Sequence, residues 1–547
     1  MFLEQLIDFL FLAIPWLISE IRCPSRQKQR KQQDSCNDNI NVPNPSNPPT
    51  DLVSPEQNFN YKEFPDAAEP ENEIEARGLL SAASTSSLNY NSLANTVVEF
   101  RSGCFLPHKS ERGPLLSSIA RSIPTNITII LSAIVISGIA GFFAYLDLET
   151  TDKCIGIEPY LNNSIPEKVL KWKLIGESCQ AWLLNFWFPA TIALLFGRKL
   201  FIEKFRSLLY IGLIMGQLVV IYKAYLFMYC GSDFRDSYYR YPGNVIFFLG
   251  GILGCIEIAR ATKQSIKRIV LKIGQIFMFS LIMCLSYRNL IVPWFNEQTS
   301  DINKAMIASI LPLFALIPVA VGKYVVLCHC TDFIQADVSF VLIYFNYLIP
   351  VALYRIMQAE LTDLRLFVAF SLLHGTFNII AQATRHFREK LWGRALRKLE
   401  TRGFRPVPYC SPRIRRLQAD LEIQDMLSQF GTLILSQVYM MLYRFSTFDV
   451  ALSDEIKRIY PRVVIGLAIE FVFAWLSTFI QVWLYNIGIK TIWFRYWLRH
   501  VLANGIIMVV AVSYFSQVLL SVFKFRMESS IHDEYTLRNC TMPFTYK

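Results

Sequence analysis

The chain contains a series of apolar segments, most of them roughly 18–24 residues long and nearly free of charge. An α-helix rises about 1.5 Å per residue, so a segment of that length crosses about 30 Å of hydrocarbon. The segments lie at roughly 124–146, 179–197, 207–229, 244–259, 270–290, 305–327, 338–357, 364–383, 426–443, 463–485 and 501–523. We therefore predict an all-α fold, a polytopic transmembrane helix bundle of about eleven spans.

Composition agrees with lipid as the main solvent. Hydrophobic residues make up 53% of the 547 residues and aromatic residues 14%, more than a soluble fold usually hides. The net charge of +11 arises largely from basic residues in short loops between the apolar segments. Such residues orient spans by the positive-inside rule, so nucleic acid is not an expected partner.

The sequence divides into six regions. Residues 1–21 are predicted to form an N-terminal helix, lying in the membrane plane or spanning it, and residues 22–122 a disordered cytosolic arm rich in Asn, Pro and Ser. A first membrane bundle of about eight spans covers 123–383, and a basic amphipathic loop follows at 384–420. Residues 421–523 form a second bundle of about three spans, and 524–547 a tail.

Three signals predict a cytosolic N-terminus and an extracellular or luminal C-terminus. The loops at 198–206, 260–268 and 385–416 are basic and would be cytosolic. Glycosylation sequons at Asn162 and Asn539 then face the opposite side. So do the cysteines Cys154, Cys179, Cys230 and Cys540, among which Cys154 with Cys179 is the expected disulfide, although the sequence leaves the pairing open. The protein is thus expected in the plasma membrane or an endomembrane, with the bilayer as its main partner and an additional cytosolic partner for the arm.

Ionisable side chains inside spans cost at least about 2.5–3.5 kcal/mol, so each requires a reason. Glu470 lies within VVIGLAIEFVFAWL, far from other charges, and is a candidate proton carrier or cation ligand. His374 and Asn378 share a helix face and could relay a proton or bind a substrate. Structural alternatives are an ion-paired Glu470 that joins two helices and a neutral core histidine.

Two lysines complete the predicted transport site. Lys323 follows Pro318 and Gly322 in an apolar segment whose prolines could break the helix, as in transporter binding sites. Lys223 is a candidate counter-charge for Glu470. Simple packing kinks, and a Lys323 that extends to the membrane surface, are the alternatives.

The segment from Arg385 to Glu400 is predicted to form a basic amphipathic helix on the inner membrane surface. Anionic lipids of the inner leaflet are its expected partner, with a passive connection between the two bundles as the alternative. Its basic face comprises Arg385, Arg388, Lys390, Arg394, Arg397 and Lys398.

No Walker A loop, nucleophile elbow or zinc-protease helix occurs, and no cofactor or metal site is predicted. A transporter or channel for an ion or small solute is therefore the leading hypothesis. A receptor or scaffold that signals through the arm and the basic loop is the second. The third is a lipid- or glycan-processing enzyme acting through the acids Asp147, Glu149 and Asp152.

Overall fold

The computed structural model describes residues 115–154, 165–230, 241–330, 334–361, 363–385, 387, 412–485, 487–523 and 538–544. Several predicted features lie outside these residues and stay predictions. They are the helix at 1–21, the arm as far as residue 114, the sequon at Asn162, and Arg388, Lys390, Arg394, Arg397 and Lys398 of the basic loop.

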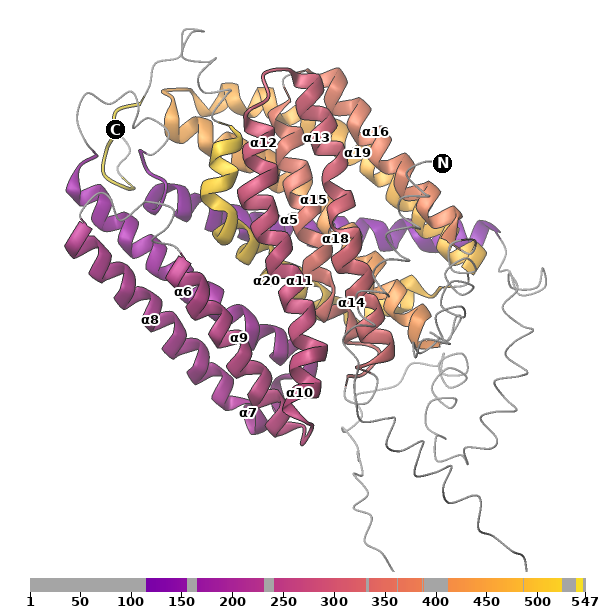
Figure 1. Ribbon diagram of the computed structural model, residues 1–547. Helices are drawn as coiled ribbons and strands as arrows, with labels where there is room; N and C mark the ends of the chain where they lie inside the picture. The colour runs from indigo at the N-terminus through magenta and orange to yellow at the C-terminus, as the bar shows by residue number, and fades with distance from the viewer. Residues whose placement is uncertain are drawn as a thin grey trace, which may run out of the picture.

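The described elements are helices (Figure 1). The first group comprises α5 (Leu115–Thr150), α6 (Glu167–Phe196), α7 (Arg198–Lys204), α8 (Arg206–Cys230) and α9 (Tyr241–Ala261). Next come α10 (Ile266–Ile269), the π-helical turn η5 (Val270–Gly274), α11 (Gln275–Ser286), the π-helical turn η6 (Tyr287–Ile291) and α12 (Val292–Asn296). The last group comprises α13 (Asp301–Phe314), α14 (Leu316–Cys328), the 3-10 turn η7 (Ser339–Leu342), α15 (Tyr344–Glu360), α16 (Leu364–Ala383), α18 (Pro412–Thr447), α19 (Leu452–Tyr485) and α20 (Ile489–Val522).

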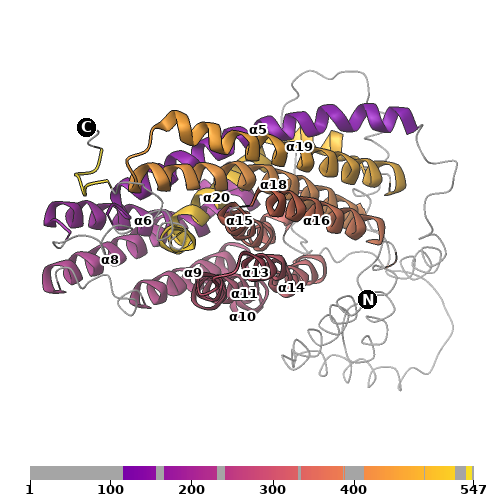
Figure 2. The same ribbon diagram turned by 90° about the horizontal axis from the view of Figure 1, so that it is seen from above.

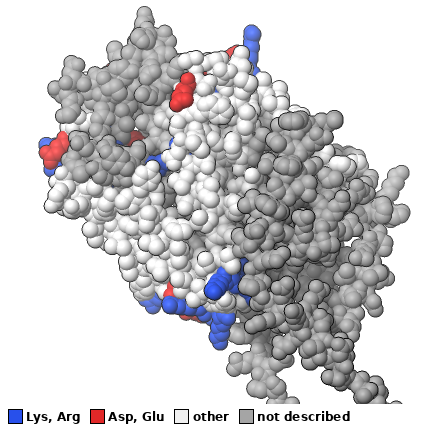
Figure 3. Space-filling view, viewed as in Figure 1, with Lys and Arg blue, Asp and Glu red and all other residues white. Residues whose placement is uncertain are grey.

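Nine helical segments of the described chain are long and apolar enough to cross a membrane, and they coincide with nine of the eleven predicted windows. Large apolar side chains such as Leu131, Val135 and Val472 point outward from them. Figure 3 shows the result, an uncharged surface between two ends that carry the charged residues. Exposing this apolar belt to water would cost much free energy, whereas contact with hydrocarbon would not. The protein is therefore an integral membrane protein.

The two remaining windows, 338–357 and 426–443, fall in α15 and α18. The predicted count of eleven is therefore not confirmed. Both helices are buried among the others: α15 packs on α13, α18 and α20, and α18 packs on α5, α15, α19 and α20 (Figure 2). Because their neighbours separate them from lipid, these two helices carry buried polar and charged residues that an exposed span could not.

Several helices extend beyond the predicted windows, since α6 begins at Glu167, α19 at Leu452 and α20 at Ile489. Helix α5 begins at Leu115, inside the region assigned to the arm, and runs 36 residues to Thr150. The segment 305–327 is interrupted as predicted, because α13 ends at Phe314, α14 begins at Leu316, and Ala315 lies between them.

Polar contacts between helix ends show which of these ends lie close together. At one end of the bundle, Lys304 of α13 pairs with Glu360 of α15, and Arg444 of α18 pairs with Glu455 of α19. At the other end, Arg413 of α18 donates to the carbonyl of Ile334, just before η7 and α15. Helix α18 therefore makes polar contacts near both of its ends, and α15 makes one at its last residue.

The structure corrects the predicted Cys154–Cys179 disulfide. Cys154 is bonded to Cys540 with a Cα–Cα distance of 5.5 Å, and Cys179 is a free, exposed thiol on α6. The tail folds back over the end of α5, where the Phe544 N–H donates to the Glu149 carboxylate at 3.1 Å. Sequence proximity favoured the closer cysteine, but a disulfide requires Cα atoms within about 7 Å.

Cleavage between residues 524 and 537 tests this disulfide. With a protease site inserted there, the C-terminal fragment is expected to stay attached on a non-reducing gel and to separate only after reduction. Cys154→Ser should release the fragment without reductant, and Cys179→Ser should not. Release by Cys179→Ser alone would instead support the bond expected from the sequence.

Candidate functional site

Helices α15, α16, α18 and α19 lie side by side (Figure 2), and a group of charged and polar side chains lies where they meet. We call it the central cluster. It comprises Arg355 of α15, His374 and Asn378 of α16, Glu422 and Asp425 of α18, and Glu470 of α19.

The Arg355–Glu470 ion pair is the strongest contact of the cluster. The Nη2 atom of Arg355 contacts Oε1 of Glu470, and the two side chains are 0% and 1% exposed. The Nη1 atom of Arg355 donates to Oε1 of Gln358 at 2.8 Å. Gln358 in turn donates to the hydroxyl of Ser371 at 2.8 Å and to the carbonyl of Phe367 at 2.9 Å. Helices α15, α16 and α19 are thus joined by one buried polar network.

Two further carboxyl groups lie beside this pair. Asp425 interacts electrostatically with both Glu422 and Glu470, and it accepts hydrogen bonds from Asn378 and, at 2.8 Å, from Gln429. Glu422 accepts from the hydroxyl of Ser477 at 2.6 Å and from the Gln382 amide at 2.8 Å. Neutral donors therefore hold both groups.

His374 packs beside the ion pair. Its ring stacks on Tyr354 with centroids 5.1 Å apart, and it lies within electrostatic range of Arg355 and Glu470. The Nε2 atom of His374 is buried and has no hydrogen-bond partner in the described structure. His374 therefore presents an unused ring nitrogen next to the Arg355–Glu470 pair.

Helical spacing explains why these side chains meet. Glu422, Asp425 and Gln429 are three and four residues apart on α18, and His374 and Asn378 are four apart on α16, so each set shares a helix face. Gly466 of α19 lets that helix approach α18, since a Cβ there would lie 3.1 Å from Leu433. Glu470, one turn further along α19, is thereby brought into the cluster.

The structure brings together Glu470, His374 and Asn378, but not the two predicted lysines. Lys223 pairs with Glu177 at 2.9 Å, so it is not the counter-charge of Glu470. Lys323 lies 5.3 Å from the ring centroid of Tyr347 and takes no part in the ion pair. The helix break at Ala315 accordingly contributes no ligand among the contacts described for the cluster.

A second polar group lies toward the end of the bundle where α18 begins. Asp420 accepts from Arg416 at 3.0 Å and lies 3.3 Å from the Nε2 atom of His500. Gln424 lies 3.0 Å from the Nδ1 atom of His500, and Asn504 donates to Gln424 at 3.2 Å. Polar side chains therefore line α18 from its first turns to the central cluster.

The acids proposed for an enzyme lie at the opposite end of the bundle and are buried. Glu149 pairs with Lys153 at 2.9 Å and also binds the Phe544 N–H, while Asp147 accepts from Gln180. Burial, with Asp147 nearby, raises the pKa of Asp152 well above its usual range. All three carboxyl groups are therefore buried, and Glu149 is held by Lys153 and by the backbone of Phe544.

The sequence analysis missed Arg355, Glu422 and Asp425. Arg355 lies inside the apolar window 338–357, so the argument applied to Glu470 would have found it. Glu422 and Asp425 precede the window 426–443 and resemble loop residues in the sequence. Only the long helix α18, which begins at Pro412, carries them into the bundle.

Neither family models nor curated proteins nor solved structures match this chain. The class, a multi-pass membrane protein with a charged core, therefore rests on the sequence and structure of this chain. Among the described residues, no group of three or more His, Cys, Asp and Glu side chains is arranged to hold a metal ion.

Proposed function

We propose that the protein is a membrane transporter or channel in which the central cluster carries a proton or small cation. One observation carries this proposal. The cluster holds three carboxyl groups, those of Glu422, Asp425 and Glu470, and among the described residues only the guanidinium of Arg355 forms an ion pair with any of them.

Charge balance supplies the physical reason. A carboxylate buried without a positive partner costs several kcal/mol, so it takes up a proton or attracts a cation instead. Glu422 and Asp425 are held by hydroxyl and amide donors, which satisfy oxygen atoms without neutralising charge. We therefore propose that the cluster takes up and releases one positive charge at Asp425.

The proposal includes eleven crossings, with α15 and α18 as inner spans. Since the Cys154–Cys540 disulfide joins the end of α5 to the tail after α20, an even number of crossings must separate them. That parity requires α15 and α18 either both to cross or both not to cross. Lysine and arginine gather at the end of the bundle that contains α7 and α10 (Figure 3), which supports a cytosolic location for that end.

Flux through reconstituted protein tests the proposal. Full-length protein in liposomes with an internal pH dye, and in parallel with Na⁺- and K⁺-sensitive dyes, is expected to show protein-dependent flux of a proton or one of these cations. Glu470→Gln should lower that flux at least tenfold, because the amide cannot take up a proton or bind a cation by charge.

Glu257→Gln serves as the matched control, because Glu257 is a partly exposed residue of α9 that pairs with Arg260 away from the cluster. Asp425→Asn provides a second variant in case Glu470→Gln does not fold, and folding is checked by size-exclusion chromatography. Undiminished flux in Asp425→Asn, or no protein-dependent flux of any of these ions, would contradict the proposal.

The receptor or scaffold hypothesis depends on the arm and the basic loop. Most of both regions lies outside the described residues, so the structure offers no observation that favours it. Within the described part of the basic loop, the Cζ atom of Arg385 lies 5.5 Å from the ring centroid of Tyr485. Binding of anionic lipid to the basic loop stays a prediction.

A further inference from the structure

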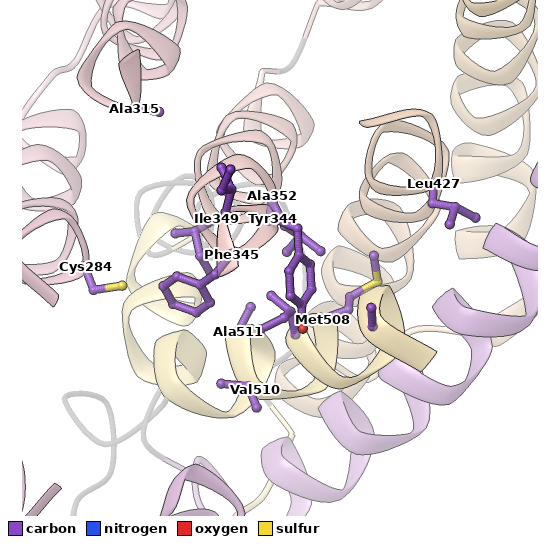
Figure 4. Close-up of a cluster of buried hydrophobic side chains, with 14 of the residues drawn as sticks. Cys284, Ala315, Tyr344, Phe345, Ile349, Ala352, Leu427, Met508, Val510 and Ala511 are labelled. Carbon is purple, nitrogen blue, oxygen red and sulfur yellow. The ribbon is translucent and has the colours of Figure 1, made fainter. Parts of the chain in front are cut away.

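A cavity of about 460 Å³ lies between α6, α8, α9, α11, α15 and α20, apart from the central cluster. Its size falls within the range of small-molecule sites, about 300–1,000 Å³. Neither Arg355 nor Glu470 lines it. Figure 4 labels five of its lining residues, Cys284, Phe345, Ile349, Val510 and Ala511.

The side chains that line the cavity determine whether its ligand is polar or apolar. It consists almost wholly of aliphatic and aromatic side chains, including Trp187, Phe188 and Phe277, which pack against one another. The hydroxyl of Ser280 is already bonded to the Asn346 amide oxygen at 2.7 Å. A charged or strongly polar ligand would lose its hydration there without replacement, so the ligand must be apolar.

The cavity extends from the lipid-facing surface to the centre of the bundle. Phe248 of α9 and Met278 and Ile282 of α11 line it and are exposed, so they mark the opening. Phe345 of α15 lines its deep end. Helix α9 packs on α6, α8, α10 and η5, and together with α11 it bounds the opening.

We infer that this cavity binds an acyl chain of a membrane phospholipid, which enters between α9 and α11 and reaches α15. Hydrocarbon is the solvent at the opening, so acyl chains are present at very high local concentration. An unfilled apolar space loses dispersion contacts along its whole lining, and a flexible chain restores them. The inference does not rest on the proposed transport function.

Photolabelling tests the inference. Full-length protein is reconstituted with phosphatidylcholine that carries a diazirine in one acyl chain, irradiated, and mapped by peptide mass spectrometry. Label is expected on buried lining residues, notably Cys255, Cys284 and Phe345, as well as on exposed Leu131.

Gly251 offers the blocking variant. It lines the cavity, and a Cβ placed on it meets nothing within 4 Å, so Gly251→Phe can fill the space without displacing a neighbour at once. Labelling of Cys284 and Phe345 should fall at least fivefold, while labelling of Leu131 stays constant. Gly138→Phe is the matched control, because Gly138 is exposed on α5 and equally unobstructed.

Three outcomes would overturn the inference. They are absence of label on the buried lining residues, unchanged labelling in Gly251→Phe, and labelling of these residues by a photoactivatable sterol but not by the phospholipid. Gly251→Leu repeats the test with a smaller side chain in case the phenylalanine variant does not fold.

Discussion

Arg355→Ala is expected to lower the free energy of unfolding by about 3–5 kcal/mol, the usual cost of removing one partner of a buried ion pair. The substitution leaves Glu470 buried without its positive partner and removes the donor to Gln358. Denaturation of purified protein in detergent, followed by tryptophan fluorescence, measures the change. Arg365→Ala is the matched control, because Arg365 is exposed at the start of α16.

A double variant that removes both charges should behave differently from Arg355→Ala. Arg355→Met combined with Glu470→Leu is expected to recover most of the lost stability, because an apolar pair of similar size avoids the desolvation of two ions. Recovery should be incomplete, since Gln358 still lacks its donor. A double variant no more stable than Arg355→Ala would show that the charges, and not merely their balance, hold α15 against α19.

Gly375→Ala is expected to destabilise the protein by about 1–3 kcal/mol, in the range measured for an overpacked core. A Cβ at this position of α16 would lie 2.3 Å from the Cγ atom of Phe473 on α19, and that atom is fixed close to its backbone. The ring must shift or the helices must separate. Thermal unfolding in detergent measures the loss.

Gly505→Ala should have the opposite sign. A Cβ there meets nothing within 4 Å, so alanine gains about 0.5–1 kcal/mol from reduced backbone freedom within α20. The two substitutions are chemically identical, which isolates the neighbour as the cause. Equal effects at both positions would show that α16 and α19 are not packed as closely as the structure places them.

The stability and flux experiments separate two roles of the central cluster. Arg355 and Glu470 hold three helices together through Gln358, so their substitution affects folding and transport alike. Asp425 is held by amide donors on α16 and α18, and Asp425→Asn therefore tests charge uptake with a smaller structural effect. A flux defect confined to Arg355 and Glu470 would assign the cluster a purely structural role.

Length and hydrophobicity were sufficient to predict the nine lipid-facing segments, because each must satisfy its own backbone in hydrocarbon. The same criterion also found α15 but could not distinguish a lipid-facing span from one enclosed by other helices. In α18 it found only the apolar part after Met426 and left Glu422 and Asp425 outside. Whether a helix is enclosed depends on which other helices pack around it, and not on its own sequence.

An ionisable residue inside an apolar segment was the other signal that the sequence offered. Isolation in an apolar segment singled out Glu470 and His374, and the structure places them in one cluster. The partner of Glu470 was not predictable, since Arg355 lies 115 residues away in the sequence. The disulfide was not predictable for the same reason, because Cys154 and Cys540 are 386 residues apart. Pairings over such distances depend on which helices become neighbours.

The sequence alone thus determined that this chain lies in a membrane, and the approximate positions of nine apolar segments, because those properties depend on local hydrophobicity and length. Only the tertiary structure decided that α15 and α18 lie inside, that Glu470 meets Arg355 rather than Lys223, and that Cys154 bonds to Cys540. Each of these depends on packing between distant segments, which no local pattern encodes.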